Sequence, residues 1–134
     1  MRDCQREKAY KWERTCIARG LALPHIKDCQ ALVDLACESF NVKAPTVTDG
    51  RARVRGTYKA ASNTIALPRL CRHERYVLHE ASHAIMRVRD SVAPWHGAEF
   101  TAIMLAVCQW WGLARPNTRD RGIAMGLKIG GSHV

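Results

Sequence analysis

The segment His79-Glu80-Ala81-Ser82-His83 carries the residue types best suited to chemistry in this chain. Two histidines four positions apart project from one face of a helix, so both imidazoles can bind one metal ion. Glu80 follows the first histidine, where its carboxylate can reach water at the metal and act as a general base rather than as a ligand. The arrangement needs a helix, because in a strand the two histidines would lie about 13 Å apart.

A third ligand is expected, because catalytic zinc sites use three protein ligands and leave one position for water. His96 is the favoured residue, since the segment 84–95 is long enough for the chain to leave the motif helix and return. Glu99 is the alternative, because sites with two histidines and one glutamate also exist. His73 lies almost two helical turns before His79, so we expect it at the surface or as a helix cap.

Hydrophobic periodicity predicts the elements that position these residues. Helices are expected over about residues 3–19, 26–39, 72–89 and 97–112, with a shorter one near 118–125. Apolar residues recur on the buried side of the motif helix, up to Val88. Alternation predicts strands over 51–58 and 63–67, joined as a hairpin, and a third strand near Pro45 and Val47. The predicted fold class is α+β, with a small antiparallel or mixed sheet of two or three strands packed on the motif helix and two or three further helices.

Length and composition indicate one domain, since the chain has 134 residues and 47% of them are hydrophobic. We divide residues 1–134 into a helical part over 1–43, a metal-site core over 44–112 and a basic, partly mobile tail over 113–134. The six cysteines form no C-x-x-C pair, which argues against a zinc ribbon. The charged N-terminus lacks the apolar region of a signal peptide, and no apolar run is long enough to span a membrane. These features predict a cytoplasmic protein with reduced thiols and no membrane contact.

The net charge of +9 is concentrated just before the motif helix. Residues 51–75 hold seven basic and one acidic side chain, so they contribute +6 of that total. This stretch predicts a basic groove formed by Arg51, Arg53, Arg55, Arg69 and Arg75. The groove would attract an acidic peptide, DNA or another polyanion. The alternative is a solvated sheet face whose charges protect an edge strand against aggregation.

The pair of motifs His79-Glu80-Ala81-Ser82-His83 and His96-Gly97-Ala98-Glu99-Phe100 resembles the zincin metallopeptidases. Within them it is most similar to the SprT-like group and its small phage and bacterial relatives. The resemblance covers about residues 44–112 and implies a minimal zincin-like fold that holds one Zn²⁺ per chain. It implies His79, His83 and His96 as ligands and Glu80 as base. The chain has no C-terminal zinc ribbon, so activity on DNA-bound proteins is not carried over.

The expected activity is that of a zinc metalloendopeptidase, a hydrolase that acts on a protein or peptide substrate. An extended substrate would pair with the edge strand at 51–58 or at 63–67. The alternative is a basic nucleic-acid- or protein-binding module with a structural or vestigial zinc site, but Glu80 favours the enzyme. Candidates for stabilising the oxyanion or contacting substrate are Tyr58, Tyr76, Arg72, Arg75 and Trp95, and candidates for orienting the imidazoles are Asp90 and Glu99.

Overall fold

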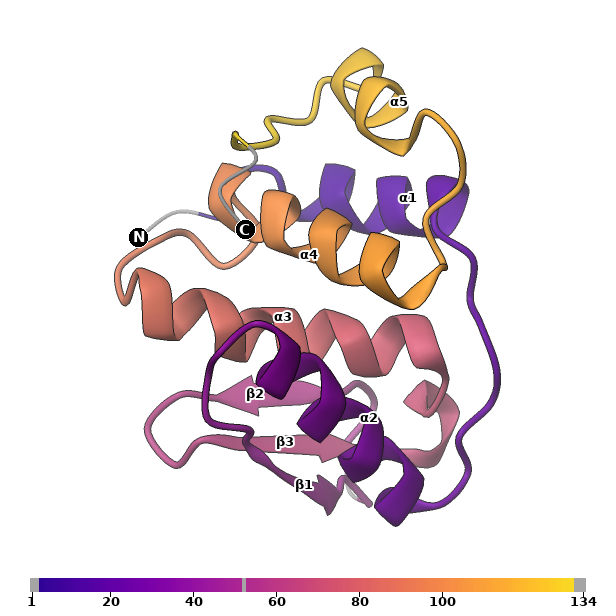
Figure 1. Ribbon diagram of the computed structural model, residues 1–134, viewed down its shortest axis with the longest axis vertical. Helices are drawn as coiled ribbons and strands as arrows, with labels where there is room; N and C mark the ends of the chain where they lie inside the picture. Colours follow the sequence, from indigo (N-terminus) through magenta and orange to yellow (C-terminus); the bar gives the residue numbers. More distant parts are fainter. Residues whose placement is uncertain (1–2, 52, 132–134) are drawn as a thin grey trace.

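A computed structural model describes residues 3–51 and 53–131 of the chain (Figure 1). The described part is α+β, as predicted. Its helices are α1 (Arg6–Cys16), α2 (Ile26–Ser39), α3 (Glu74–Arg89), α4 (Ala98–Trp111) and α5 (Thr118–Ala124), with a short 3₁₀ turn, η1 (Arg69–Cys71). Its strands are β1 (Thr46–Asp49), β2 (Thr57–Lys59) and β3 (Thr64–Leu67). Within these residues, no helix has the length and apolar character needed to cross a bilayer.

The small sheet has the strand order β1-β3-β2. Strands β2 and β3 pair antiparallel with Tyr58 opposite Ile65, which confirms the predicted hairpin. Strand β1 pairs parallel to β3 with Val47 also opposite Ile65, which confirms the third strand. The sheet is therefore mixed. Because β3 lies in the centre, it offers no free edge, and the prediction that 63–67 could pair with a substrate is wrong.

The predicted strand over 51–58 is mostly wrong, because only its end belongs to β2. The backbone turns after β1, where the amide of Arg53 donates to the carbonyl of Gly50, and residues 54–55 form a bend. Both edges of β3 are occupied by β1 and β2, so this stretch has no strand beside it to pair with. The side chain of Val54 is 92% exposed, so the apolar half of the alternating pattern has nothing to pack against.

Helix α3 lies in the middle of the fold, with α4 and α1 on one side and the sheet and α2 on the other (Figure 1). Its position explains why polar as well as apolar side chains on it are buried, including those of the motif. Val77, Leu78 and Ile85 belong to the core, as predicted. Val88 was expected on the buried side but is 65% exposed, because it lies in the last turn, beyond the packed part of the helix.

Helix α1 is shorter than the predicted span 3–19, because Ile17 leaves the helix and forms an isolated bridge with Ala114. The buried indole of Trp12 donates to the carbonyl of Thr118, which joins α1 to α5. The amide of Gly130 donates to the carbonyl of Ala98. The tail therefore returns across α1 and the start of α4. Its last residues, 132–134, for which mobility was predicted, lie outside the described residues.

Candidate metal centre

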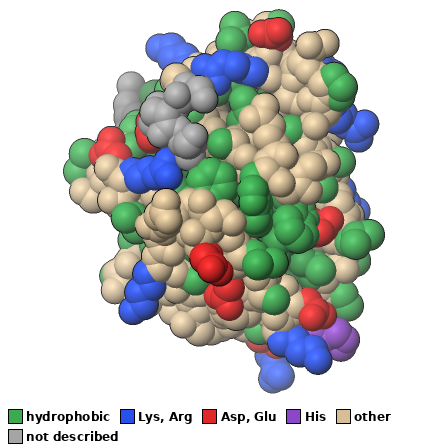
Figure 2. Space-filling view, in the orientation of Figure 1, with side chains coloured by type: hydrophobic (Ala, Val, Ile, Leu, Met, Phe, Trp, Pro, Cys, Tyr) green, Lys and Arg blue, Asp and Glu red, His purple; other side chains and the backbone are tan. Residues whose placement is uncertain are grey.

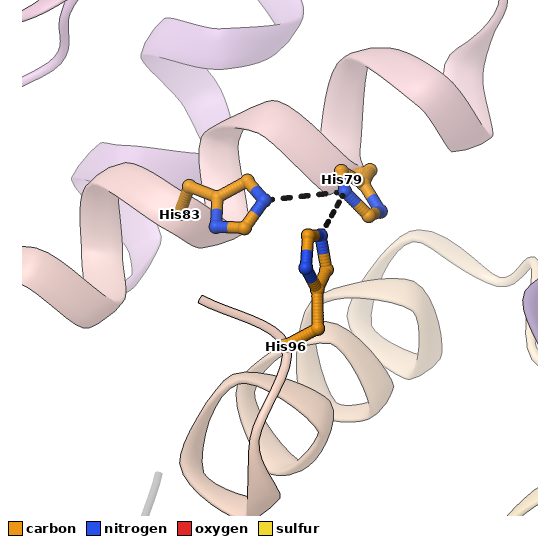
Figure 3. Close-up of side chains that lie close together, drawn as sticks. All are labelled: His79, His83 and His96. Carbon is orange, nitrogen blue, oxygen red and sulfur yellow. Dashed lines mark hydrogen bonds between the residues drawn. The ribbon is translucent and has the colours of Figure 1, made fainter. Parts of the chain in front are cut away.

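Three buried histidine rings meet at one point (Figure 3). His79 and His83 project from successive turns of α3, and His96 projects from the loop that leads into α4. The Nε2 atom of His79 lies 3.2 Å from Nε2 of His83 and 3.3 Å from Nε2 of His96. One candidate ligand atom from each residue lies within 4.8 Å of the others. The structure therefore brings together the three histidines that the sequence singled out, and the cluster can hold a metal ion.

Two of the rings are oriented by carboxylates on their far sides. Nδ1 of His79 lies 2.7 and 2.9 Å from the two carboxylate oxygens of Glu13, and Nδ1 of His96 lies 2.8 Å from Oδ2 of Asp3. A carboxylate only accepts hydrogen bonds, so Nδ1 of each ring carries a proton and donates it. Nε2 of each ring is then directed at the meeting point, as second-sphere carboxylates direct it in known metal sites.

The spacing of the nitrogens agrees with a bound zinc ion. Two nitrogens that each lie about 2.05 Å from a tetrahedral zinc ion are separated by about 3.3 Å. The observed separations of 3.2 and 3.3 Å match this value. Two of the three nitrogen pairs therefore have the spacing expected around one shared metal ion, and all three ligand atoms lie within 4.8 Å of one another.

Burial and neighbouring charges act differently on the three imidazoles. Burial opposes a charge on His79, but the charge and hydrogen bond of Glu13, together with the charge of Glu80, outweigh it and raise the pKa of His79. Burial lowers the pKa of His83 and of His96, and the positive charge on His79 lowers both further. Carboxylates thus favour positive charge at His79, whereas burial and His79 disfavour it at the other two rings.

Glu80 lies beside the cluster, 4% exposed, and its Oε2 atom has no hydrogen-bond partner within the described residues. Burial raises the pKa of Glu80 to about 7, while the nearby His79 opposes this rise and Glu13 adds to it. A buried carboxylate oxygen without a partner is costly unless something else in the working protein satisfies it. Water at the metal would supply the missing donor.

A cavity of about 220 Å³ opens beside the cluster and is lined by Glu80, His83 and His96. Two of the predicted substrate-contacting residues, Tyr58 and Trp95, also line it. The indole of Trp95 packs edge-on against the ring of His83 at 5.3 Å and carries the guanidinium of Arg87 over its face at 3.8 Å. These aromatic side chains form an apolar wall next to the polar centre.

Three other predicted contact residues do not line this cavity. The buried guanidinium of Arg72 donates to the carbonyls of Leu67 and Pro24 and pairs with Asp49 at 3.0 Å. Arg75 donates to the carbonyl of Ile17 at 2.9 Å and so links the end of α1 to α3. The hydroxyl of Tyr76 accepts from the amide of Gly56 at 3.1 Å. All three side chains hold the framework around the site.

The residues that orient the imidazoles differ from those expected. Asp90 accepts from the amide of Val92, so it stabilises the loop after α3 instead. Glu99 lies in the first turn of α4 and is not part of the three-histidine cluster. Glu13 and Asp3 take the orienting role, and sequence reasoning missed both. One signal for Glu13 was available, because it lies on the buried side of α1 with Ala9, Trp12 and Cys16, where a charge needs a partner.

Tyr10 is a further residue that sequence reasoning missed. Its ring stacks on that of His79, with centroids 5.4 Å apart and planes 14° apart, and lies 5.1 Å from the ring of His96. Burial, followed by the charges of Glu80 and Glu13, raises the pKa of Tyr10. Helix α1 therefore supplies one wall of the site, although the first 40 residues carry no recognisable motif.

The predicted basic groove is divided by the fold. Arg51, Arg53 and Arg69 line a separate cavity of about 800 Å³ near the start of α2, whereas Arg55 lines the cavity at the histidines. Arg75 is engaged between α1 and α3. Lys and Arg side chains on the face shown in Figure 2 are dispersed rather than gathered in one stripe. The larger cavity also contains none of the three clustered histidines.

His73 caps the start of α3, as expected, because its Nδ1 accepts from the amide of Tyr76. The cysteines on the helix faces are buried free thiols, as predicted. These are Cys16, Cys29, Cys37 and Cys108.

Comparison with known proteins finds no family model, curated protein or solved structure that matches this chain. The resemblance to the SprT-like zincins therefore rests on the two motifs alone.

Proposed function

We propose that the protein is a zinc-dependent peptidase in which Glu80 is the general base. One observation carries the proposal. Three buried imidazoles meet beside a cavity that two of them line, and the same cavity is lined by a buried carboxylate with an unpartnered oxygen among the described residues. A helix that needed only to pack would place apolar side chains at these positions, since buried polar groups are costly.

The donor set favours zinc and a catalytic site over a structural one. Imidazole nitrogens are good zinc ligands, and structural zinc sites are normally closed by four protein ligands. Among the described residues the cluster contains three, and it borders a cavity. A site of this kind keeps a position for water or substrate, which a purely structural role does not require.

In the proposed reaction the residues of this chain divide the work. His79, His83 and His96 would hold one Zn²⁺, which would supply the Lewis acidity that activates water and polarises a peptide carbonyl. Glu80 accepts a proton from the attacking water at Oε2 and returns it to the amine that leaves. Glu13 and Asp3 keep two of the imidazoles in the correct tautomer throughout.

Strand β2 offers a place for the substrate backbone. It is an edge strand of the sheet, and Thr57 and Tyr58 line the cavity beside the histidines. An extended peptide that pairs with this edge would pass the metal centre with its backbone held by main-chain hydrogen bonds. Of the edge strand predicted over 51–58, only residues 57 and 58 belong to β2.

Two measurements test the proposal. Metal analysis of the purified protein should give about one zinc ion per chain, and His79→Ala, His83→Ala and His96→Ala should each lose it. His25→Ala is the matched control, because this exposed histidine lies at the start of α2, outside the cluster, and zinc should be retained.

The second measurement follows hydrolysis of a protein mixture by mass spectrometry. The zinc-loaded protein should generate new peptide termini, and Glu80→Gln should keep zinc while lowering turnover at least a hundredfold. Unchanged turnover in this variant would rule out Glu80 as the base. Absence of cleavage by the zinc-loaded protein would favour the alternative of a binding module with a structural zinc.

A further inference from the structure

A second recess adjoins the metal cavity and is dominated by arginine. It has a volume of about 270 Å³ and is lined by Arg6, Arg14 and Arg55, together with Glu7, Tyr10 and Tyr76. We call it the arginine recess. Two of these arginines, Arg6 and Arg55, and the side chain of Tyr10 line the metal cavity as well. The two hollows therefore adjoin each other, with these side chains at their shared border.

We propose that the arginine recess binds an acidic side chain of the peptide substrate, close to the bond that is cleaved. The proposal rests on the peptidase function and adds to it a class of preferred substrate. It assigns the recognition to Arg6, Arg14 and Arg55, of which only Arg55 was singled out by the sequence. Glu7 is the one carboxylate among the residues that line the recess.

The charges of the recess are poorly compensated. Within residues 3–51 and 53–131, neither Arg6, Arg14 nor Arg55 forms an ion pair with a carboxylate at 4.0 Å or less. By contrast, Arg51 and Arg72 both pair with Asp49. Three guanidinium groups against one carboxylate leave a positive recess, in which Arg6 also interacts with Tyr10. A carboxylate can accept two parallel hydrogen bonds from one guanidinium group, which makes arginine well suited to this task.

The recess lies within reach of a substrate held at the metal centre. Its two tyrosines pack around His79, with ring centroids 5.4 Å away for Tyr10 and 6.0 Å away for Tyr76. An extended peptide advances about 3.3 Å per residue. A side chain one or two positions from the scissile bond would therefore reach the recess. Arg55 precedes the edge strand β2, so a peptide paired with that strand would continue past it.

The same features favour a peptide over a nucleic acid. A nucleic acid is bound mainly through a series of phosphates, which needs cations distributed along a track. Here Arg51, Arg53 and Arg69 border a different cavity, so the arginine recess is an isolated cluster. A small positive hollow beside a metal centre matches one carboxylate side chain better than a polyphosphate backbone.

Binding tests the recess without requiring turnover. The zinc-loaded Glu80→Gln protein is titrated into a labelled peptide rich in Asp and Glu, and fluorescence anisotropy is compared with that of the matched Asn and Gln peptide. We expect at least tenfold tighter binding of the acidic peptide, with a strong dependence on salt. Arg55→Glu should abolish this difference. Arg53→Glu is the matched control, because it makes the same charge change two residues away but borders the other cavity, and it should keep the preference.

Any of three other results of this titration would overturn the proposal. Equal loss in Arg53→Glu and Arg55→Glu would show a general effect of surface charge. Equal binding of both peptides would remove the acidic preference, and tighter binding of a single-stranded oligonucleotide that displaces the acidic peptide would assign the recess to nucleic acid.

Cleavage of a peptide library separates this inference from the proposed function. The zinc-loaded wild type should show Asp or Glu enriched within two residues of the cleaved bonds, and Arg55→Glu should lose the enrichment while still cleaving other sequences. Cleavage without any enrichment would overturn the proposal that the recess binds acidic side chains, and the proposed peptidase function would stand. The opposite result is binding of the acidic peptide that depends on Arg55, without cleavage of any peptide. It would overturn the proposed peptidase function, and the assignment of the recess would stand.

Discussion

Two carboxylate–histidine pairs support the three-histidine cluster, and they are anchored very differently. The Glu13–His79 pair joins the middle of α1 to α3, and the Glu13 side chain is 6% exposed. The Asp3–His96 pair joins the segment before α1 to the loop before α4, and the Asp3 side chain is 27% exposed. Their shortest hydrogen bonds are almost equal, at 2.7 and 2.8 Å. A carboxylate thus accepts a hydrogen bond from a histidine Nδ1 in both pairs, but it is buried in the first pair and partly exposed in the second.

Two hydrogen bonds of nearly equal length can therefore contribute very differently to the free energy of unfolding. Loss of a buried charged partner leaves the other group unpaired in a low dielectric, whereas a partly exposed group can turn to water. His83 is a third case, because its Nδ1 atom is buried and has no partner within the described residues. We therefore expect the core pair to govern stability and both pairs to govern metal affinity.

Removal of the metal should have the largest effect. A ligand that binds only the folded state at a thousand times its dissociation constant adds about 4 kcal/mol to the free energy of unfolding. Urea unfolding of the zinc-loaded and chelated protein should show a difference of this size. In the chelated protein, hydrogen exchange should increase at the amide of His96, which donates to Asp3, more than at amides inside α1. Identical stability with and without zinc would contradict the assignment of the metal site.

Glu13→Ala should have the next largest effect. It leaves His79 buried without its partner, so the free energy of unfolding should fall by about 3 kcal/mol. Zinc affinity should fall about 10- to 100-fold, because the imidazole loses its orienting acceptor. Chemical unfolding and competition with a zinc-binding dye measure the two quantities. Glu7→Ala is the matched control on the exposed face of the same helix, and it should change neither by a comparable amount.

Asp3→Ala should weaken zinc binding about tenfold but lower the free energy of unfolding by less than about 1 kcal/mol. The partly exposed position of Asp3 lets water replace its contact with His96. The same two assays apply. Destabilisation as large as that of Glu13→Ala would show that the edge pair is as much a part of the folded core as the other pair.

The acid sensitivity of the fold can be separated from that of the histidine cluster. Burial, aided by Arg19 and Arg75, lowers the pKa of His73 from 6.5 to about 4, and this residue lies outside the three-histidine cluster. The unfolded chain therefore takes up the proton first, and the free energy of unfolding of the chelated protein should fall between pH 6.5 and pH 4.

His73→Asn should remove roughly 1–2 kcal/mol of that fall, because asparagine can still cap α3 but does not titrate. Urea unfolding at a series of pH values measures this. An identical pH profile in the variant would assign the acid sensitivity to the groups around the metal site.

The helical elements could be predicted closely because their signals are local. Apolar spacing and stop residues place α2 at its observed bounds and α4 within one residue of them. The strand expected over 51–58 failed for the opposite reason. Alternation of Arg with small residues satisfies a local rule, but a strand forms only where it pairs with another strand, and β2 pairs with β3 over just three residues.

The sequence by itself determined the chemistry at the centre, because His79, Glu80 and His83 are related by helical periodicity and need no distant contact to share a face. It also placed His96 as a candidate partner through the length of the loop that follows α3. Only the tertiary structure decided what surrounds them. Glu13 is 66 residues from His79 and Asp3 is 93 residues from His96, and nothing local relates such positions. Helix α1 contacts α3 through Glu13 and Tyr10, and Asp3 lies just before this helix. Burial of the apolar face of α1 therefore fixes where these polar side chains lie relative to the histidines.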